Sequence, residues 1–289
     1  MNRIPDLHSH STASDGTLTP EQLVIRAWAA GVEVLALTDH DTTAGLGAAA
    51  SAAATCGLVL VPGVEVSVTW GGRTVHVVGL HIDTHCPELA QGLAGLRAYR
   101  DWRAQEIGRC LARCGIAGAY DGALAFARGP LIGRTHFARF IVQQGRAKNV
   151  ADVFKHFLVR GKPGHVPGDW ATLEDAVSWI LAAGGQAVIA HPGRYGFKRA
   201  KMRELLGGFR ELGGVGVEVI SGSHSRDDAF VFARWARDMR LLASAGSDYH
   251  GPEEAWIELG RLPALPPGCT PIWADWTNGL HGQRAVGFS

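Results

Sequence analysis

Residues 6–16 of this 289-residue chain read DLHSHSTASDG, and the interpretation of the whole sequence starts from this stretch. Asp6, His8 and His10 alternate, and alternation on a β-strand sends every second side chain to the same face of the sheet. The two imidazoles therefore point the same way, at a spacing that suits a shared metal ion. A half-buried strand rarely carries three ionisable groups on its inward face without a function for them. We interpret this stretch as part of a metal site, with Asp15 in the turn that follows.

Polar side chains return further along the chain, most of them at or just beyond the ends of apolar, β-branched runs. The runs are VLALTDH, LVLVPGVE, TVHVVGL, QAVIAHP and LLASAGSDYH, and the residues are His40, Glu65, His76, His191, Asp248 and His250. In a parallel α/β barrel the active site lies at the C-terminal ends of the strands. The repeated placement therefore predicts a barrel with the chemistry gathered at one mouth.

Length and charge narrow the class of protein. A chain of 289 residues fits an α/β barrel with one insertion. A net charge of +1 gives no global basic field of the kind that holds duplex nucleic acid. Arginine outnumbers lysine by 23 to five, which suits bidentate contacts to phosphate, although a GC-rich genome explains the bias better.

The five cysteines, at 56, 86, 110, 114 and 269, form an odd count without a disulfide-like layout, so we expect a reduced cytoplasmic protein. Cys110 and Cys114 lie one helical turn apart and are expected to pack on a helix, not to bind metal. No signal peptide is expected ahead of the first motif. No apolar run approaches about 18 residues, so no membrane span is expected.

Hydrophobic periodicity and capping residues predict the order of the elements. Strands are expected at 4–10, 32–38, 58–62, 186–190, 215–220 and 241–245, with a β-ribbon at 66–80 around Gly71-Gly72. Glu65 is expected just past the third strand. Helices are expected at 19–31, 43–56, 87–114, 172–184, 199–212 and 225–238.

The βα alternation stops near residue 85 and resumes after 165. Between them lie the long expected helix and short ones, including 135–144 and 149–158, followed by the Gly- and Pro-rich linker GKPGHVP at 161–167. We therefore divide the chain into a first barrel part (1–96), a helical cap (97–165) and a second barrel part (166–289). The tail after Gly260 is expected to wrap the barrel.

Nine candidate metal ligands result: His8, His10, Asp15, His40, Glu65, His76, His191, Asp248 and His250. Imidazole and carboxylate donors favour manganese, iron or zinc over copper(I) or a structural zinc site. Nine ligands are too many for one ion, and with one bridging carboxylate they suit two or three. Three divalent ions carry +6 and three carboxylates −3, which leaves about +3 to bind a phosphate.

The motifs DLHSH, TDHD, PGVE, HP and SDYH resemble those of the PHP (polymerase and histidinol phosphatase) family of metal-dependent phosphoesterases, over residues 4–83 and 166–255. The resemblance implies a distorted (β/α)7 barrel and a trinuclear cluster. By it, the first ion is held by His8, His10, Glu65 and Asp248, the second by Glu65, His76 and His191, and the third by Asp15, His40 and His250. Asp6 and Asp39 also match family positions and are expected to orient imidazoles by hydrogen bonds.

Segments of the cap resemble a narrower group. IGRTHFARFIV and GKPGHVP are similar to a PHP subgroup with 3′,5′-nucleotide bisphosphate phosphatases, whose relatives include the RNase AM type of 5′-to-3′ exoribonuclease. The expected substrate contacts are Arg134, His136, Lys162, Arg194 and His224. Arg134 is favoured as a phosphate contact, because arginine can bind a phosphate bidentately. The other four residues are equally compatible with packed or solvated roles.

Several polar or aromatic residues receive no functional role. Glu218 can face the barrel interior, but no function is assigned to it. His81, His85, His156, His165 and His281 are expected to be ordinary histidines. Trp256, Trp273 and Trp276 are expected to pack in the core and not to stack a base.

The resemblance implies hydrolysis of a phosphate monoester by a metal-bound hydroxide, with no protein nucleophile. The expected substrate is a nucleoside 3′,5′-bisphosphate such as pAp, which would lose its 3′-phosphate to give the 5′-monophosphate. The alternatives are a 5′-to-3′ exoribonuclease acting on 5′-phosphorylated short RNA and a non-catalytic PHP module. We expect two or three divalent ions, with manganese ahead of zinc or iron. The partner would be a small nucleotide or short single-stranded RNA, with no membrane and no obligate protein partner.

Overall fold

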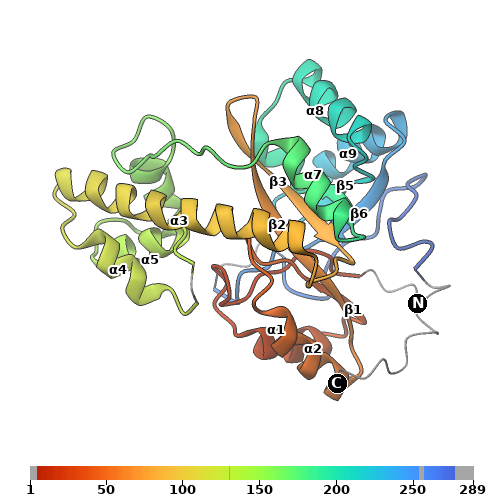
Figure 1. Ribbon diagram of the computed structural model, residues 1–289, viewed down its shortest axis with the longest axis horizontal. Helices are drawn as coiled ribbons and strands as arrows, with labels where there is room; N and C mark the ends of the chain where they lie inside the picture. The colour runs from red at the N-terminus through yellow and green to blue at the C-terminus, as the bar shows by residue number, and fades with distance from the viewer. Residues whose placement is uncertain (1–4, 130, 254–256, 277–289) are drawn as a thin grey trace.

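A six-stranded sheet in the order β1-β2-β3-β4-β5-β6 forms the centre of the protein in a computed structural model that describes residues 5–129, 131–253 and 257–276 (Figure 1). The strands are β1 (Val34–Leu37), β2 (Val59–Trp70), β3 (Arg73–Leu80), β4 (Gln186–Ile189), β5 (Gly216–Ser221) and β6 (Leu242–Gly246). β3 runs antiparallel to both neighbours, and the other pairs are parallel. The sheet is therefore mostly parallel with one reversed strand, and the predicted ribbon over 66–80 forms around Gly71-Gly72.

The first predicted strand closes this sheet into a distorted barrel. The backbone N–H of Asp6 donates to the carbonyl of Val34 in β1 at 3.0 Å, and that of Leu7 donates to the carbonyl of Ala245 in β6 at 2.9 Å. The segment makes isolated bridges and no continuous ladder. The predicted α/β barrel class is thus confirmed, with the metal motif on its most irregular strand.

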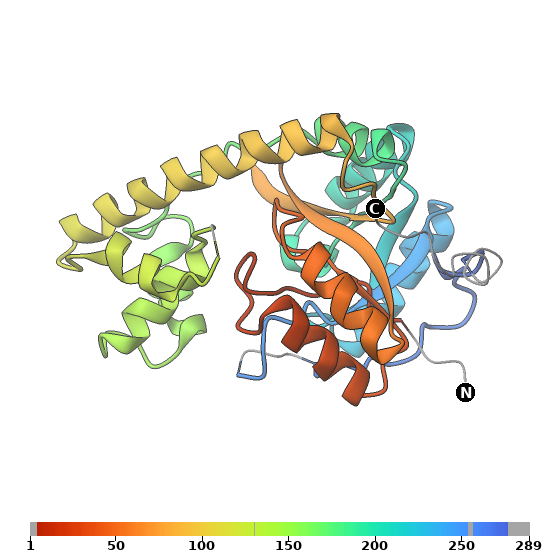
Figure 2. The ribbon, with the colours of Figure 1, turned by 60° about the horizontal axis from the view of Figure 1, so that its bottom comes forward.

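Helices cover the outside of the barrel (Figure 2). They are α1 (Pro20–Ala29), α2 (Leu46–Cys56), α7 (Leu173–Ala182), α8 (Arg199–Glu211) and α9 (Arg226–Asp238). α1 begins with a capping box formed by Thr19 and Gln22, and α2 ends at Gly57, which is in the left-handed region at φ +74°. The main hydrophobic core lies between these helices and the strands, and a smaller cluster with Leu7 and Val78 fills the barrel.

The end of the third predicted strand was predicted wrongly. β2 continues from Val59 through Pro62 to Trp70, so Glu65 lies inside a strand and not after one. Pro62 marks the point at which β2 changes partner, because it pairs with Leu37 of β1 and the next residue, Gly63, pairs with β3. The strand therefore continues through a residue that normally ends one.

The helix α3 (Pro87–Arg113) joins the barrel to a second group of helices (Figures 1 and 2). These are α4 (Ala119–Phe126), α5 (Arg134–Gln143), α6 (Val150–Val153) and the π-helix η1 (Phe154–Leu158). Leu89 and Leu93 of α3 pack in the barrel core, whereas Ile107 and Leu111 pack in a separate core with the smaller helices. We call this second group the cap, and its boundaries at residues 97 and 165 remain a prediction.

The tail packs against the barrel. The N–H of Ile272 donates to Ala243 in β6, and Trp276 Nε1 donates to Gln186 Oε1 at 3.0 Å. Trp273 and Trp276 lie against the cluster inside the barrel, as core packing requires. Trp256 and His281 fall outside the described residues. No helix within the described ranges is long and apolar enough to cross a membrane.

Candidate metal centre and the cavity above it

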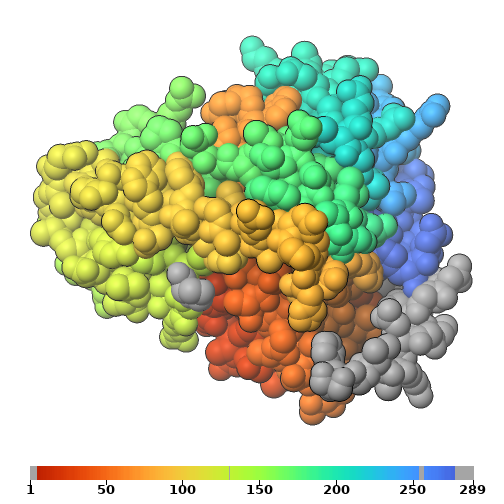
Figure 3. Space-filling view, viewed as in Figure 1, coloured from red at the N-terminus to blue at the C-terminus, as the bar shows by residue number. Residues whose placement is uncertain are grey.

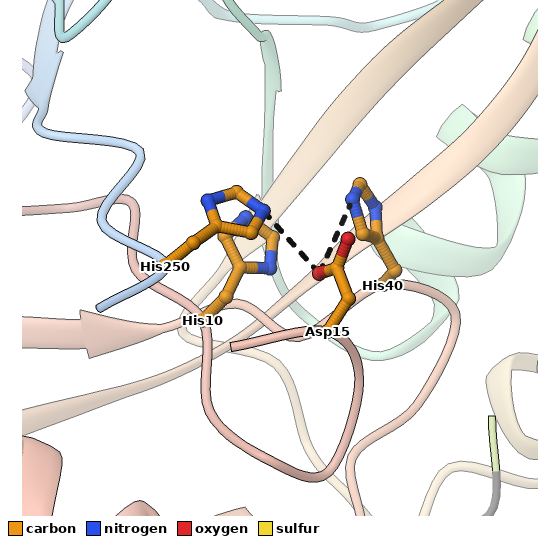
Figure 4. Close-up of side chains that lie close together, drawn as sticks. All are labelled: His10, Asp15, His40 and His250. Atoms are coloured by element: carbon orange, nitrogen blue, oxygen red, sulfur yellow. Dashed lines mark ion pairs between the residues drawn. The ribbon is translucent and has the colours of Figure 1, made fainter. Parts of the chain in front are cut away.

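All nine predicted ligands lie together at one mouth of the barrel. Their donor atoms form four overlapping groups, each with all atoms within 4.8 Å of one another. The groups are His10, Asp15, His40 and His250; His8, Glu65 and His191; His8, His10 and Asp248; and His40, Glu65 and His76. Figure 4 shows the first of these, with the Asp15 carboxylate between the imidazoles of His40 and His250. The sequence pattern thus found residues that meet, although ligation by each one remains a prediction.

Glu65 lies at the centre of the cluster and is fully buried. Its Oε1 is 2.8 Å from His76 Nδ1 and 2.9 Å from His191 Nε2. Its Oε2 is 2.8 Å from His40 Nδ1. Both oxygens of this carboxylate face imidazoles, and a ligand that bridges two cations would be placed in the same way.

The residues fit divalent cations by a second criterion. Asp15 Oδ1, His40 Nδ1 and Glu65 Oε2 are buried atoms without a hydrogen-bond partner. The last two lie 2.8 Å apart, yet their orientation makes no hydrogen bond. Buried polar atoms left unpaired are costly, and a cation between them would satisfy both. Imidazole nitrogen and carboxylate oxygen are donors that manganese, iron and zinc accept.

Electrostatics keep the carboxylates of the cluster ionised. Burial alone would raise the pKa of Glu65, but the imidazoles of His40, His76 and His8 hold it well below its usual value. The same competition lowers the pKa of Asp15, where His250 and His40 oppose burial. Both carboxylates are therefore in the form that binds a cation.

The imidazoles divide into two kinds. Burial lowers the pKa of His10 to about 3 and that of His76 to about 4, so both are neutral at pH 7. Burial also acts on His250, but the Asp15 carboxylate outweighs it and raises the pKa to about 9. Because a ligand imidazole is neutral, cation binding at His250 must release a proton.

Glu218 is a functional residue that sequence reasoning missed. Its Oε1 lies 2.6 Å from His8 Nδ1, and its Oε2 accepts the backbone N–H of His191 at 2.5 Å. It is 1% exposed, so this carboxylate holds two predicted ligands from behind. The signal was a lone carboxylate in the buried strand GVEVIS, because a buried carboxylate needs partners.

The roles expected of Asp6 and Asp39 need correction. The Asp6 carboxylate accepts the backbone N–H of Ser247, and Asp39 accepts from the hydroxyls of Ser11 and Ser14. Both carboxylates therefore fix loops and do not contact the imidazoles directly. Asp39 acts only through Ser14, whose Oγ lies 3.5 Å from Nδ1 of His10.

A cavity of about 290 Å³ opens beside the cluster, lined in part by Asp15, His40, His76 and His191. Four guanidinium groups face it, those of Arg100, Arg103, Arg134 and Arg194. Burial lowers the pKa of Arg134 to about 10 and that of Arg103 to about 9, so both stay cationic at pH 7. The rings of Phe154 and Trp170 also line it. A site of this charge favours a polyanionic ligand.

Two of the four arginines are held by acidic partners. Arg194 donates at 2.6 Å to Oδ2 of Asp248, which is itself a predicted ligand. Arg100 donates to Asp41 Oδ2 at 2.5 Å and to Ser67 Oγ at 2.8 Å. Neither Arg100 nor Arg103 was predicted from the sequence. The signal that could have found them is their three-residue spacing on α3, which puts them on one helix face.

The five predicted substrate residues separate in the structure. Arg134 and Arg194 line the cavity, whereas the other three do not belong to its described wall. His136 is buried in the cap, where its Nδ1 accepts the N–H of Gly133. Lys162 is exposed in the linker. His224 Nε2 accepts the N–H of Gly193, and its ring stacks on Phe232. The contacts of His136 and His224 explain why these two side chains lie elsewhere, and substrate contact by any of the five remains a prediction.

Comparisons with known proteins agree with this geometry. The PHP domain family matches residues 6–100. The chain is 51% identical to the 3′,5′-nucleoside bisphosphate phosphatase of Chromobacterium violaceum, over 93% of this chain and 95% of that protein. It is 45% identical to a 5′-3′ exoribonuclease of Haemophilus influenzae, over 94% and 99%. The crystallised amidohydrolase from Chromobacterium violaceum, with bound sulfate and no metal, superposes with a TM-score of 0.91 at 51% identity, covering 94% and 95%. The chain therefore belongs to the PHP family and is a hydrolase of phosphate esters.

Proposed function

We propose that this enzyme removes the 3′-phosphate from nucleoside 3′,5′-bisphosphates such as pAp and leaves the nucleoside 5′-monophosphate. The observation that carries the proposal is one cavity with predicted cation ligands on one side and four guanidinium groups around it. A substrate with two phosphates matches a site with two separate anion-binding features. The 51% identical phosphatase of Chromobacterium violaceum supports the same choice.

The cations would supply an activated water and neutralise charge on the phosphate. We propose two or three of them, manganese first, held by the nine residues of the cluster. The chain's own groups do the rest. Arg194 lies against Asp248 and so is placed to hold the phosphate that is cleaved. Arg134 makes no ion pair with any carboxylate in the part of the chain that the structure describes, and it is placed to hold the phosphate that is retained.

The aromatic wall suits the remaining part of a nucleotide. Trp170 and Phe154 line the cavity, and the guanidinium carbon of Arg134 lies 5.5 Å from the Phe154 ring centroid. A base or ribose that enters between these rings and the arginines would be held without being read by sequence-specific hydrogen bonds. We propose this as the reason for a preference for nucleotides over simple phosphates.

The test compares Arg134→Ala on two substrates. Loss of a charge-assisted hydrogen bond costs about 1.5–3 kcal/mol, so KM for pAp should rise roughly 10- to 100-fold. KM for 4-nitrophenyl phosphate should hardly change, because it has no second phosphate. Arg146→Ala, at an exposed position after α5, is the matched control. An equal effect of Arg134→Ala on both substrates would contradict the assignment of Arg134.

A second candidate function is 5′-to-3′ exonuclease action on short RNA, because a relative of that name matches almost the full chain. The same arginines would then anchor the 5′-phosphate. Initial rates of phosphate release from pAp and of mononucleotide release from a 5′-phosphorylated oligomer, at matched concentrations, separate the two. Faster release from RNA would make the nuclease the main activity. A cytoplasmic location and independence of membranes and of protein partners also remain proposals.

The non-catalytic alternative is not supported, since both enzymes above match over nearly their whole length.

A further inference from the structure

The carboxylate of Asp15 faces in two directions. Its Oδ1 lies 3.3 Å from His250 Nε2 and 3.9 Å from His40 Nε2, on the side of the predicted cation (Figure 4). Its Oδ2 accepts a hydrogen bond from Thr135 Oγ at 3.0 Å, on the side of the cap. One buried side chain therefore joins the barrel mouth to the first turn of α5.

A second contact ties the same helix to the same loop. Arg139, one turn further along α5, donates to the backbone carbonyl of Asp15 at 2.9 Å. α5 also carries Arg134, which lines the cavity. In the space-filling view the yellow-green part of the cap lies beside the red N-terminal part of the barrel (Figure 3). The position of this helix and the orientation of Asp15 are therefore linked by direct contacts.

The hydroxyl of Thr135 engages one of the two oxygens of the carboxylate. With Oδ2 engaged, Oδ1 is left buried without a hydrogen-bond partner and directed at the imidazoles. The N-terminus of α5, whose dipole favours negative charge, lies on the same side. A side chain held in this way loses little conformational entropy when a cation binds to its free oxygen.

We infer that Thr135 is a positioning residue that couples the seating of the cap to cation binding at Asp15, His40 and His250. This rests on the proposed function to the extent that these three residues bind a cation. Coupling between two binding events is reciprocal. A cation at this position therefore holds α5 against the barrel, and contact of α5 with the barrel increases the affinity for the cation.

Thr135→Val tests the coupling because it removes the donor and nearly keeps the shape. In calorimetric titrations of the chelator-treated protein, one class of Mn²⁺ site should bind roughly 10-fold more weakly, while the other sites are unchanged. Mn²⁺ should also protect residues 134–143 from hydrogen exchange less than in the wild type. Thr135→Ser should restore both readouts. Thr55→Val, at an exposed position of α2, should change neither.

Asp15→Asn separates the failure of the inference from that of its premise. If Asp15→Asn weakens one Mn²⁺ site and Thr135→Val does not, the coupling is overturned while the cation assignment stands. Weaker Mn²⁺ binding in Thr135→Val with unchanged hydrogen exchange in α5 also overturns it. If Asp15→Asn leaves every Mn²⁺ site intact, the assignment of Asp15 as a ligand is wrong and the inference fails with it.

Discussion

Replacing Glu218 with glutamine tests whether the carboxylate behind the cluster holds the ligands in place. Both of its oxygens are in use, one with His8 Nδ1 at 2.6 Å and the other with the backbone N–H of His191 at 2.5 Å. Glutamine keeps the shape but offers one acceptor, and its NH₂ group must face the other donor. The variant therefore leaves one donor unpaired at a position that is 1% exposed.

The magnitude follows from two independent arguments. A hydrogen bond to a charged group contributes about 1.5–3 kcal/mol, which corresponds to roughly 10- to 100-fold in a binding constant. Loss of the partner of a metal-binding imidazole typically costs about the same factor. We therefore expect Mn²⁺ to bind Glu218→Gln roughly 10- to 100-fold more weakly. Activity should fall most at low Mn²⁺ and recover largely in excess Mn²⁺.

The assay is calorimetric titration of chelator-treated protein with Mn²⁺, followed by kcat/KM at low and high Mn²⁺. Glu211→Gln makes the same chemical change at the exposed end of α8 and serves as the control. Thermal unfolding of both variants shows whether the fold is intact. Titrations of Glu218→Gln that match those of the wild type would refute the role given to this carboxylate.

Two further perturbations act on the fold as a whole. Burial raises the pKa of Asp6 to about 6, against the opposing hydrogen bond from Ser247. The stability that this group contributes is complete below about pH 4 and is lost as the pH rises to about 6, by about 3 kcal/mol. In urea unfolding of the chelator-treated protein, the free energy of unfolding should therefore fall less between about pH 4 and pH 6 for Asp6→Asn than for the wild type. Parallel pH dependences in the two proteins would contradict the raised pKa of Asp6. Removing cations with a chelator should lower Tm. Adding Mn²⁺ at a concentration 100-fold above its Kd should then raise the free energy of unfolding by about 2.7 kcal/mol. A Tm that changes with neither treatment would contradict the ligand set.

The ligand cluster could be predicted from the sequence because its information is local. His8 and His10 share a face by strand alternation, and His191 and Asp248 follow strands that apolar runs mark clearly. Parallel strands then bring their ends to one mouth without any knowledge of packing. Glu65 shows the limit of this reasoning. Its strand continues past Pro62 because it changes pairing partner there, and the sequence of one segment does not reveal which strands it pairs with.

The residues that line the cavity could be predicted only in part, because their orientation depends on how the cap packs on the barrel. Successive residues of a helix point about 100° apart. On α5, Arg134 and Thr135 therefore face the barrel, while His136 turns back to the N–H of Gly133. The motif GRTH marks all of them equally. Arg100 was missed for the same reason, since the face of α3 that looks into the cavity is fixed by tertiary contacts.

This division has a consequence for how such enzymes differ in substrate. The predicted ligands and Glu218 come from the strands of the barrel and the loops beside them, and six of the nine ligands are buried, as is Glu218. The cavity arginines come mainly from α3 and α5, outside the strands. Changes in the cap can therefore alter which phosphate ester fits while the cluster stays intact. The hydrogen bond between Asp15 and Thr135 is a point at which the two parts cannot vary independently.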